Sequence, residues 1–299
     1  MEKISQIYDK IFKRIITLSS PAIIRFINTV FEKDFELDSE ITYNWTESVD
    51  DELDKTIADT IITINDIFKF HTEVQITDDN SMALRMFEYE FREALKYKEI
   101  EDNKVVLSLP EARIIYLEHT ENTPEYVDIV FYFQGQGVFE YRIKAEMLLR
   151  YSVDDLNNSG MIILMPLYLL KLRKKIVKSY KKKPVELAAE LKMLIESCII
   201  SIEANKEKGN ITLADTDILI NLLSRLYNQL YADYEVFKEE GVDSMITGGI
   251  VTYGEQRVIE RTIELAKKML KRGLSIIDVA EDTGLDESTI RQLQSELTS

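Results

Sequence analysis

The sequence predicts an α/β fold, and three observations support that prediction. Apolar residues recur at helical spacing at the start of the chain, segments with strand-type alternation follow, and a second helical pattern separates these from further strand-like segments. Spacings of three to four residues are typical of helices, and a period of two is typical of strands. Because the two patterns alternate along the chain, an α/β core is favoured over separate layers of helices and strands.

The elements expected in the first half follow in order. Residues 5–31 form a helical pattern that is interrupted at Ser20-Pro21, a signal for a helix break and restart. A first strand is expected over 41–49, and a hairpin follows it. The next helix is predicted over 82–98, with its apolar stripe formed by Leu84, Phe87, Phe91 and Leu95. Further strands are expected over 112–118, 127–133 and 138–145, with a turn at 134–137.

The hairpin carries the most informative polar residues. Two strand-like runs, 56–64 and 68–76, are separated by the turn-type triplet Asn65-Asp66-Ile67. If this triplet is the loop, Ile64 pairs with Phe68, and Asp59 then lies opposite Glu73. The period of two places Asp59, Glu73 and Gln75 on one face. The other face is predicted to enter the core and consists of Ala58, Ile62, Ile64, Phe68, Phe70, Val74 and Ile76.

Two carboxylates that face each other across strands repel unless a positive charge lies between them. A hard divalent cation such as Mg²⁺ meets that need, because it accepts one or two carboxylates and retains water or phosphate oxygens. The alternative is an ordinary solvated face. Ile57 and Ile61 share the face of the carboxylates, which favours the metal site, since charges among isoleucines on a covered sheet need a reason to be there.

The order of Asp59, a strand, a hairpin and Glu73-Val74-Gln75 resembles the PD-(D/E)XK phosphodiesterase superfamily, in the variant in which Gln replaces the motif lysine. Residues 8–13 (YDKIFK), 41–45 (ITYNW) and 85–89 (RMFEY) resemble its recombination-promoting nuclease and putative transposase branch. The resemblance covers most of the chain. It implies a restriction-endonuclease-like core, a mixed sheet flanked by helices in the order helix, three strands, helix, strand.

The resemblance also implies an activity, that of a metal-dependent DNA endonuclease. Asp59 and Glu73 would hold Mg²⁺ or Mn²⁺, the backbone carbonyl of Val74 would complete the ligands, and Gln75 would orient the water or the phosphate. Asp9 is a candidate for a further ligand. Lys13 and Arg85 are candidates for contacts with nucleic acid. The alternatives are that Asp9 and Lys13 form a helical ion pair and that Arg85 is an ordinary surface residue.

A second function remains open on the same residues. A catalytically inactive nuclease fold that binds DNA or a protein partner would explain Gln75 and the acidic net charge of −16. Conversely, a binding module has no need of two opposed carboxylates. A transposase that joins DNA ends would need strand-transfer chemistry, for which no residue here is diagnostic.

Composition narrows the compartment and the metal chemistry. No apolar run approaches a membrane span and the N-terminus lacks a signal-peptide pattern, so we expect a cytoplasmic protein. The single cysteine, Cys198, lies in an apolar helical segment and is expected in the core. Only two histidines, His71 and His119, are present, which disfavours zinc sites built on histidine pairs. His71 has the parity of Glu73, so one interpretation places it at the border of the site, and the favoured one is a surface or rim residue.

A basic run precedes the helical half of the chain. It consists of Lys171, Arg173, Lys174, Lys175, Lys178, Lys181, Lys182 and Lys183. Lys174 and Lys175 are candidates for contacts with a phosphate backbone. The equal alternative is a solvated helix end, where cations are favourable.

The second half is predicted to be helical. Helices are expected over 185–205 and 212–238, and a leucine stripe (Leu219, Leu222, Leu223, Leu226 and Leu230) packs either in the core or in a homodimer interface. Residues 276–290 resemble a helix-turn-helix in which Gly284 forms the turn and Asp286 caps the second helix. The predicted organisation is a nuclease-like core (1–165), a helical region (166–240), a linker (241–255) and a tail (256–299).

Overall fold

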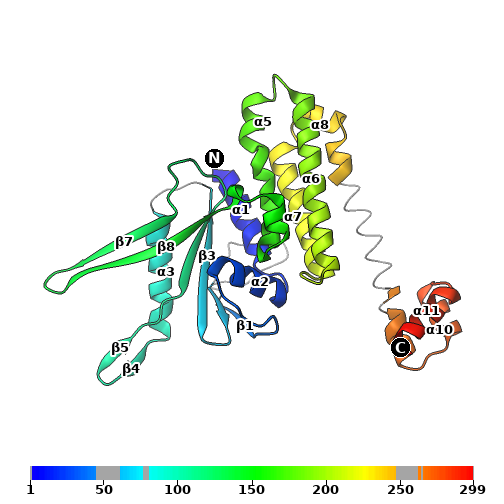
Figure 1. The fold of residues 1–299 in the computed structure, drawn as a ribbon, viewed down its shortest axis with the longest axis horizontal. Coiled ribbons are helices and arrows are strands. Elements are labelled where there is room, and N and C mark those ends of the chain that lie inside the picture. Colours follow the sequence, from blue (N-terminus) through cyan, green and yellow to red (C-terminus); the bar gives the residue numbers. More distant parts are fainter. Residues whose placement is uncertain (1, 45–60, 77–80, 247–261, 264, 299) are drawn as a thin grey trace. The chain divides into compact units, whose positions relative to one another are not determined.

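The computed structural model describes residues 2–44, 61–76, 81–246, 262, 263 and 265–298. The chain divides into two compact units, Met1–Asp243 and Ser244–Ser299. The first unit contains a six-stranded sheet with helices packed on it, and it takes in both the predicted core and the predicted helical region (Figure 1).

The N-terminal helices break where the sequence predicts. Helix α1 (Glu2–Ile15) ends before the Ser20-Pro21 signal, and α2 (Ser20–Phe31) begins there with Pro21 in its first turn. Proline is tolerated at that position because its missing N–H would have no partner within the helix. Helix α2 ends at Glu32, whose φ of 56° is left-handed.

The sheet is mixed, as predicted. Its strands are β1 (Ile41–Asn44), β2 (Ile61–Ile64), β3 (Phe68–Gln75), β6 (Glu111–Tyr116), β7 (Tyr126–Phe133) and β8 (Gly137–Met147). Their spatial order is β1-β2-β3-β6-β8-β7, with β3, β6 and β8 parallel and the other neighbours antiparallel. The predicted order of helix, three strands, helix and strand is therefore present in α2, β1 to β3, α3 and β6. Its assignment as a restriction-endonuclease-like fold stays a prediction.

Helix α3 (Met82–Lys96) covers one face of the sheet, where Met86 packs with Ile114 and Ile143. The predicted stripe on this helix was wrong, because Leu84 is 60% exposed and Leu95 is 43% exposed. The buried side of α3 instead carries two carboxylates as well as methionine and alanine. Polar partners on the sheet and on the helix itself make this burial possible, as described below.

Aromatic rings connect α2 to the opposite face of the sheet. The ring centroids of Phe31 and Phe70 lie 4.8 Å apart, and the guanidinium of Arg113 lies over the Phe31 ring. A short hairpin of β4 (Glu99–Glu101) and β5 (Lys104–Val106) follows α3 and was not predicted. It forms a separate two-stranded sheet and adds no strand to the main sheet.

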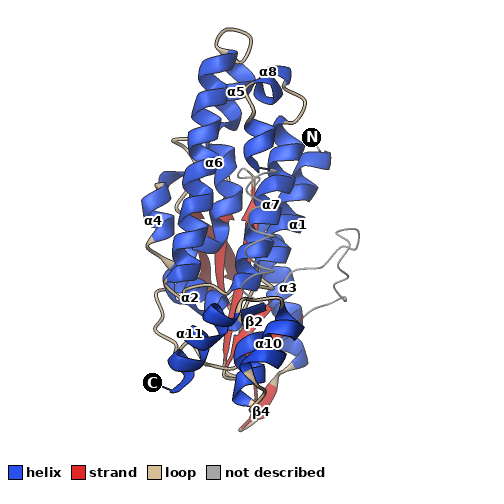
Figure 2. Ribbon diagram, turned by 90° about the vertical axis from the view of Figure 1, so that its right-hand side faces the viewer, coloured by secondary structure: helices blue, strands red, loops and turns tan. Residues whose placement is uncertain are grey.

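The helical region packs around an apolar 3₁₀ helix, η2 (Gly160–Leu172), whose residues 161–170 are all buried. A helix that is apolar on every side belongs in a core. The surrounding helices are α4 (Val153–Asn157), α5 (Arg173–Ser179), α6 (Pro184–Glu207), α7 (Leu213–Tyr231) and α8 (Glu235–Glu239), and a 3₁₀ turn, η1 (Leu148–Arg150), precedes them. Figure 2 shows α6 and α7 side by side.

The leucine stripe of α7 lies in this core. Leu219, Leu222, Leu223 and Leu226 are buried, and α7 packs on η2 and α6. Packing within the chain therefore accounts for the stripe, and the homodimer through this region stays a prediction. Among the helices of the described ranges, none combines the length and apolar character needed to cross a bilayer.

The second unit is a small helical cluster. Helices α10 (Ile276–Thr283) and α11 (Glu287–Thr298) follow a helical segment at 265–271, and their buried residues are Ala266, Val279, Ile290 and Leu293. Gly284 adopts a left-handed φ of 69° between α10 and α11. The Thr289 N–H donates to Asp286 Oδ1 at 2.9 Å, which confirms the predicted cap. The helix-turn-helix assignment itself stays a prediction.

Candidate active site

The central hairpin has the register that the sequence predicts. Ile64 pairs with Phe68 and Ile61 pairs with His71. The turn places Asn65 and Asp66 at left-handed φ values of 53° and 58°, a conformation that Asn and Asp tolerate better than most residues. Asp59 lies outside the described residues.

Glu73 lies on β3 in the middle of the sheet, on the face that α3 covers. Its side chain is 13% exposed, and its neighbour on β6 is Ile114. Gln75 is the last residue of β3, and the period of two places it on the same face as Glu73. The structure thus brings two of the three predicted catalytic residues to one end of one strand.

The direction of the Val74 carbonyl follows from the hydrogen bond of the next residue. The carbonyl oxygen of Gln75 accepts a hydrogen bond from the Leu117 N–H at 2.8 Å, on the β6 side. Successive carbonyls of a strand point to opposite edges, so the Val74 carbonyl faces the β2 edge.

The expectation that His71 is a surface or rim residue was wrong. Its side chain is 0% exposed, with Nδ1 2.7 Å from Glu90 Oε1 and Nε2 3.4 Å from Glu73 Oε1. Helix α3 accounts for the difference, because it covers β3 and places Glu90 against the imidazole. Two signals in the sequence point to this contact: His71 has the parity of Glu73, and Glu90 lies one helical turn beyond Met86.

The charges around His71 outweigh its burial. Burial alone disfavours the imidazolium, but the hydrogen bonds and negative charges of Glu73 and Glu90 raise the pKa of His71 to about 9. The ring is therefore charged at neutral pH, and both of its N–H groups donate to carboxylates. Glu73 is held by a buried cation, which restricts how its carboxylate turns.

Tyr141 extends this network by one hydrogen bond. Its hydroxyl, on β8, donates to Glu90 Oε2. Burial and the nearby charge of Glu90 raise the pKa of Tyr141, so the phenol keeps its proton. The chain of contacts runs from Tyr141 through Glu90 and His71 to Glu73, and only Glu73 is predicted from the sequence as a catalytic or metal-binding residue.

On α1, Asp9 and Lys13 form an ion pair, which is the simpler of the two alternatives given for them above. Lys13 Nζ lies 2.9 Å from Asp9 Oδ2, one helical turn away. The Lys13 side chain is 11% exposed, whereas that of Asp9 is 42% exposed. Asp9 is thus neutralised by an ion pair within α1.

The two candidate lysines of α5 differ in their surroundings. Lys174 Nζ lies 3.2 Å from the buried carboxylate of Glu118, to which Arg173 also donates at 2.8 Å. The Glu118 N–H donates to the Ile76 carbonyl, so this cluster stands beside the end of β3. Lys175 contacts Glu190 of α6 instead, at 2.5 Å.

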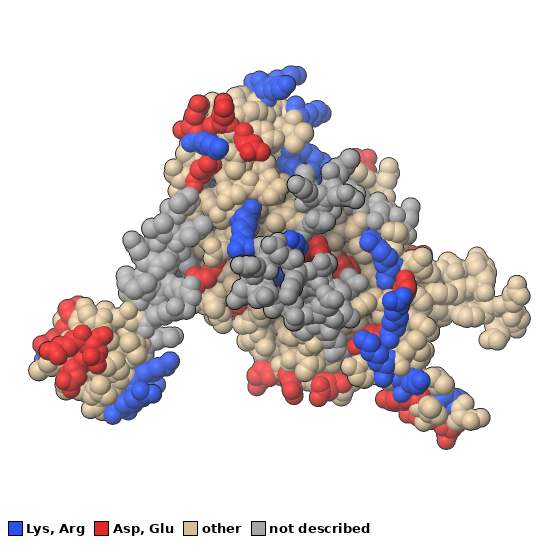
Figure 3. Space-filling view, turned by 180° about the vertical axis from the view of Figure 1, so that it is seen from behind, with Lys and Arg blue, Asp and Glu red and all other residues tan. Residues whose placement is uncertain are grey.

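Exposed cations also lie along α3. Arg85, Arg92 and Lys96 are exposed on this helix, and Figure 3 shows a row of Lys and Arg side chains over this region. Arg92 pairs with Glu88 and Lys96 with Glu93. These cations lie on the exposed side of the helix that covers the sheet face carrying Glu73.

The described donors suit a hard cation. A glutamate carboxylate and a backbone carbonyl are oxygen ligands, which Mg²⁺ and Mn²⁺ prefer, and His71 serves as a hydrogen-bond donor to the carboxylate rather than as a ligand. Within the described ranges no group of three or more His, Cys, Asp or Glu residues is arranged to bind a metal. The second predicted carboxylate, Asp59, lies outside those ranges. The donors considered above are therefore the Glu73 carboxylate and the Val74 carbonyl, both of which the structure describes.

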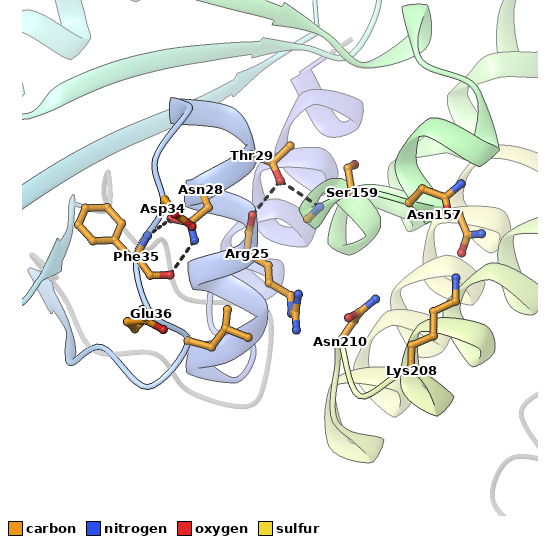
Figure 4. A pocket seen from close by; sticks show the side chains of 13 residues that line it. Arg25, Asn28, Thr29, Asp34, Phe35, Glu36, Asn157, Ser159, Lys208 and Asn210 are labelled. Atoms are coloured by element: carbon orange, nitrogen blue, oxygen red, sulfur yellow. Dashed lines mark hydrogen bonds between the residues drawn. The ribbon is translucent and has the colours of Figure 1, made fainter.

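A polar pocket elsewhere in the first unit is separate from this site. It has a volume of about 510 Å³ and lies between α2, the loop after it and the segments around Asn157 and Asn210 (Figure 4). Arg25 lines it, with a buried Nε for which the described residues provide no hydrogen-bond partner. Among the described residues, none of the predicted site residues lines this pocket.

Comparisons with protein-family models, with curated proteins and with solved structures give no match for this chain. The likeness to the recombination-promoting nuclease branch therefore depends on the residues quoted above, together with their order along the chain.

Proposed function

We propose that this protein is a metal-dependent DNA endonuclease of the recombination-promoting nuclease type. The observation that carries the proposal is Glu73, a nearly buried carboxylate on a central strand that a buried imidazolium holds in place. Buried ion pairs contribute little net stability, because desolvation offsets their attraction. A network of this kind is consistent with a chemical role for the carboxylate.

The residues take distinct roles in this proposal. Glu73, Asp59 and the Val74 carbonyl bind one or two Mg²⁺ or Mn²⁺ ions, which supply Lewis-acid activation of the phosphate and of a water. Gln75 donates a hydrogen bond to the water or to a phosphate oxygen, and being neutral it contributes no charge. His71 keeps the Glu73 carboxylate oriented.

Nucleic-acid contacts are assigned to the cations nearest this face. Arg85 lies at the start of α3. Lys174 pairs with Glu118, whose N–H donates to the Ile76 carbonyl just after the end of β3. Lys13 pairs with Asp9 and Lys175 with Glu190, and the proposal does not require either lysine. DNA is the proposed substrate because the resemblance implies it.

Cleavage of supercoiled plasmid DNA with Mg²⁺ or Mn²⁺ tests the proposal. We expect nicking by the wild type and a loss of at least about 100-fold in Asp59→Ala and Glu73→Ala, which corresponds to about 3 kcal/mol of transition-state stabilisation. The matched control is Glu88→Ala, which removes an exposed carboxylate of α3 that pairs with Arg92. Its activity should equal that of the wild type.

Two results would contradict the assignment. Equal nicking by all variants would place the activity elsewhere or in a contaminant. The inactive binding module would be favoured if the wild type did not nick DNA and if calorimetry showed no Mn²⁺ binding that Glu73→Ala removes. The substitution of Gln75 for the usual lysine and the ion pairs of Lys13 and Lys175 are the observations that favour that second function.

A further inference from the structure

The hairpin of β7 and β8 leaves one edge of the sheet open. In the described part of the chain, β7 pairs only with β8 and is the last strand of the sheet. Figure 1 shows this hairpin extending away from the helices. An unpaired edge presents backbone N–H and C=O groups that another strand can bind.

The residues that face the open edge follow from one hydrogen bond. The Ala145 N–H donates to the Glu125 carbonyl at 2.8 Å, so Glu125 is hydrogen-bonded to β8 and every second residue after it is as well. The residues between them direct their N–H and C=O groups outward. These are Tyr126, Asp128, Val130 and Tyr132.

Several apolar side chains of this hairpin are exposed. Tyr132 is 78% exposed, Phe139 is 59% exposed and Phe133 is 53% exposed. Val130 and Val138 are exposed as well. Exposed apolar surface of this extent on a protein with a net charge of −16 marks an interaction site.

The apolar surface continues onto α3. The rings of Phe91 and Phe87 stack with centroids 6.0 Å apart, Phe87 contacts Phe131 at 4.9 Å, and Phe131 contacts Phe139 at 6.5 Å. Leu84 and Leu95 are exposed on the same helix. We call the exposed apolar residues of β7, β8 and α3 the aromatic edge, which consists of Leu84, Phe91, Leu95, Tyr126, Val130, Tyr132, Phe133, Val138 and Phe139.

We propose that the aromatic edge binds a second copy of this chain, through antiparallel pairing of β7 with its twofold-related equivalent. An antiparallel pair of identical strands is self-complementary, so both copies use the same surface. The outward backbone groups of β7 supply the hydrogen bonds, and the rings on either side of the strand cover them.

The charges on β7 fit this occupant. Asp128 is the only charged residue in the strand, and Arg142 of β8 neutralises it through contacts of 2.8 and 3.0 Å. Registers that place Asp128 opposite Val130 of the other copy avoid like-charge contact. Two chains of high negative charge therefore meet at a nearly neutral strand.

The area of the aromatic edge is sufficient for a dimer. Aromatic side chains contribute roughly 150–250 Å² each when fully buried, and those here are about half exposed. Including the exposed valines and leucines, the surface available is roughly 800–1,000 Å² per copy, compared with about 800 Å² per partner in interfaces of standard size.

Sedimentation analysis of the full chain over a range of concentrations tests this proposal. We expect the mass to rise from 34.8 kDa to about twice that value as the concentration increases. Val130→Lys places a charge at the edge, and Val130→Pro removes an outward N–H without breaking the ladder to β8. Each should weaken the dimer by at least about 100-fold.

The matched control is Val177→Lys, which introduces the same charge at a valine that is 70% exposed on α5. It should dimerise as the wild type does, and circular dichroism should show all variants folded. A wild type that stays monomeric at about 100 μM, or a dimer that both Val130 variants retain, would overturn the proposal. The first result would leave the edge to a different protein.

Discussion

The two long hairpins of this sheet are built from similar residues but have opposite environments. In the β2–β3 hairpin, Ile61, Ile62 and Ile64 are buried, and so is the polar side chain of His71. In the β7–β8 hairpin, Tyr132 and Phe139 are exposed although they are apolar. Position in the sheet therefore decides burial here, and composition alone does not.

Neighbouring elements explain the contrast. The strand β3 has a partner on each side and helices over both faces, so a polar group there must find a partner within the protein. The strand β7 has one partner and an open edge. The first hairpin is thus constrained by internal contacts, and the second is available to an external partner.

The largest expected effect comes from breaking the polar network under α3. In Glu90→Ala, the buried His71 loses its 2.7 Å partner and the partly buried Tyr141 loses its acceptor. Removing one member of a buried charged pair typically lowers the free energy of unfolding by about 3–5 kcal/mol. Urea denaturation followed by circular dichroism measures this loss.

The control for that variant lies on the same helix. Glu88→Ala removes a carboxylate that is 60% exposed, and its free energy of unfolding should stay within about 0.5 kcal/mol of the wild type. If Glu90→Ala were as mild as Glu88→Ala, the network would contribute nothing to holding β3 and α3 together.

A smaller effect is expected from pH. The pKa of His71 is raised from 6.5 to about 9 in the folded protein, so the stability that its charge contributes is complete below about pH 6.5. It is lost as the pH rises through 9. The raised pKa corresponds to roughly 3 kcal/mol between these limits.

Denaturation in EDTA at pH 6.5 and pH 9, with His71→Gln as the control, isolates this contribution. The wild type should lose more stability over the interval than His71→Gln does. The other histidine, His119, has a pKa lowered by burial and neighbouring cations, and it is present in both proteins, so its contribution cancels in the comparison. Identical losses in both proteins would show that His71 is not charged in the fold.

The smallest expected effect distinguishes the two turns. Gly137 closes the β7–β8 hairpin with a φ of 117°, and a Cβ there would meet no atom within 4 Å. The cost of Gly137→Ala is therefore backbone strain alone, about 1–2 kcal/mol. In the β2–β3 turn, Asp66 already tolerates a φ of 58°, and Asp66→Gly should change stability by less than about 1 kcal/mol.

Thermal unfolding of both variants compares the turns directly. A Gly137→Ala protein as stable as the wild type would mean that the β7–β8 turn relaxes to another conformation. Such a turn would also shift the strand that carries the aromatic edge.

Several features of the fold and site follow from local patterns. The register of Ile64 with Phe68, the break at Ser20-Pro21 and the cap at Asp286 all agree with the sequence analysis. Each depends on residues close together in the chain, where turn chemistry and the period of two are sufficient. The placement of Glu73 and Gln75 on one face has the same origin.

Other features depend on contacts between distant residues. Periodicity identified a helix after the hairpin but selected Leu84 and Leu95 for its buried side, whereas the sheet buries the side that carries Glu90. A carboxylate is an acceptable core residue only when a partner such as His71 is present, and that partner is 19 residues away.

The sequence by itself determined the break between the first two helices, the register of the central hairpin and the position of Glu73 on its second strand. The tertiary structure decided that His71 is a buried cation, that the leucines of α7 fill a core and that Tyr132 and Phe139 stay exposed. Local patterns fix the direction in which side chains alternate, but burial depends on which surfaces meet, and these surfaces come from segments far apart in the chain.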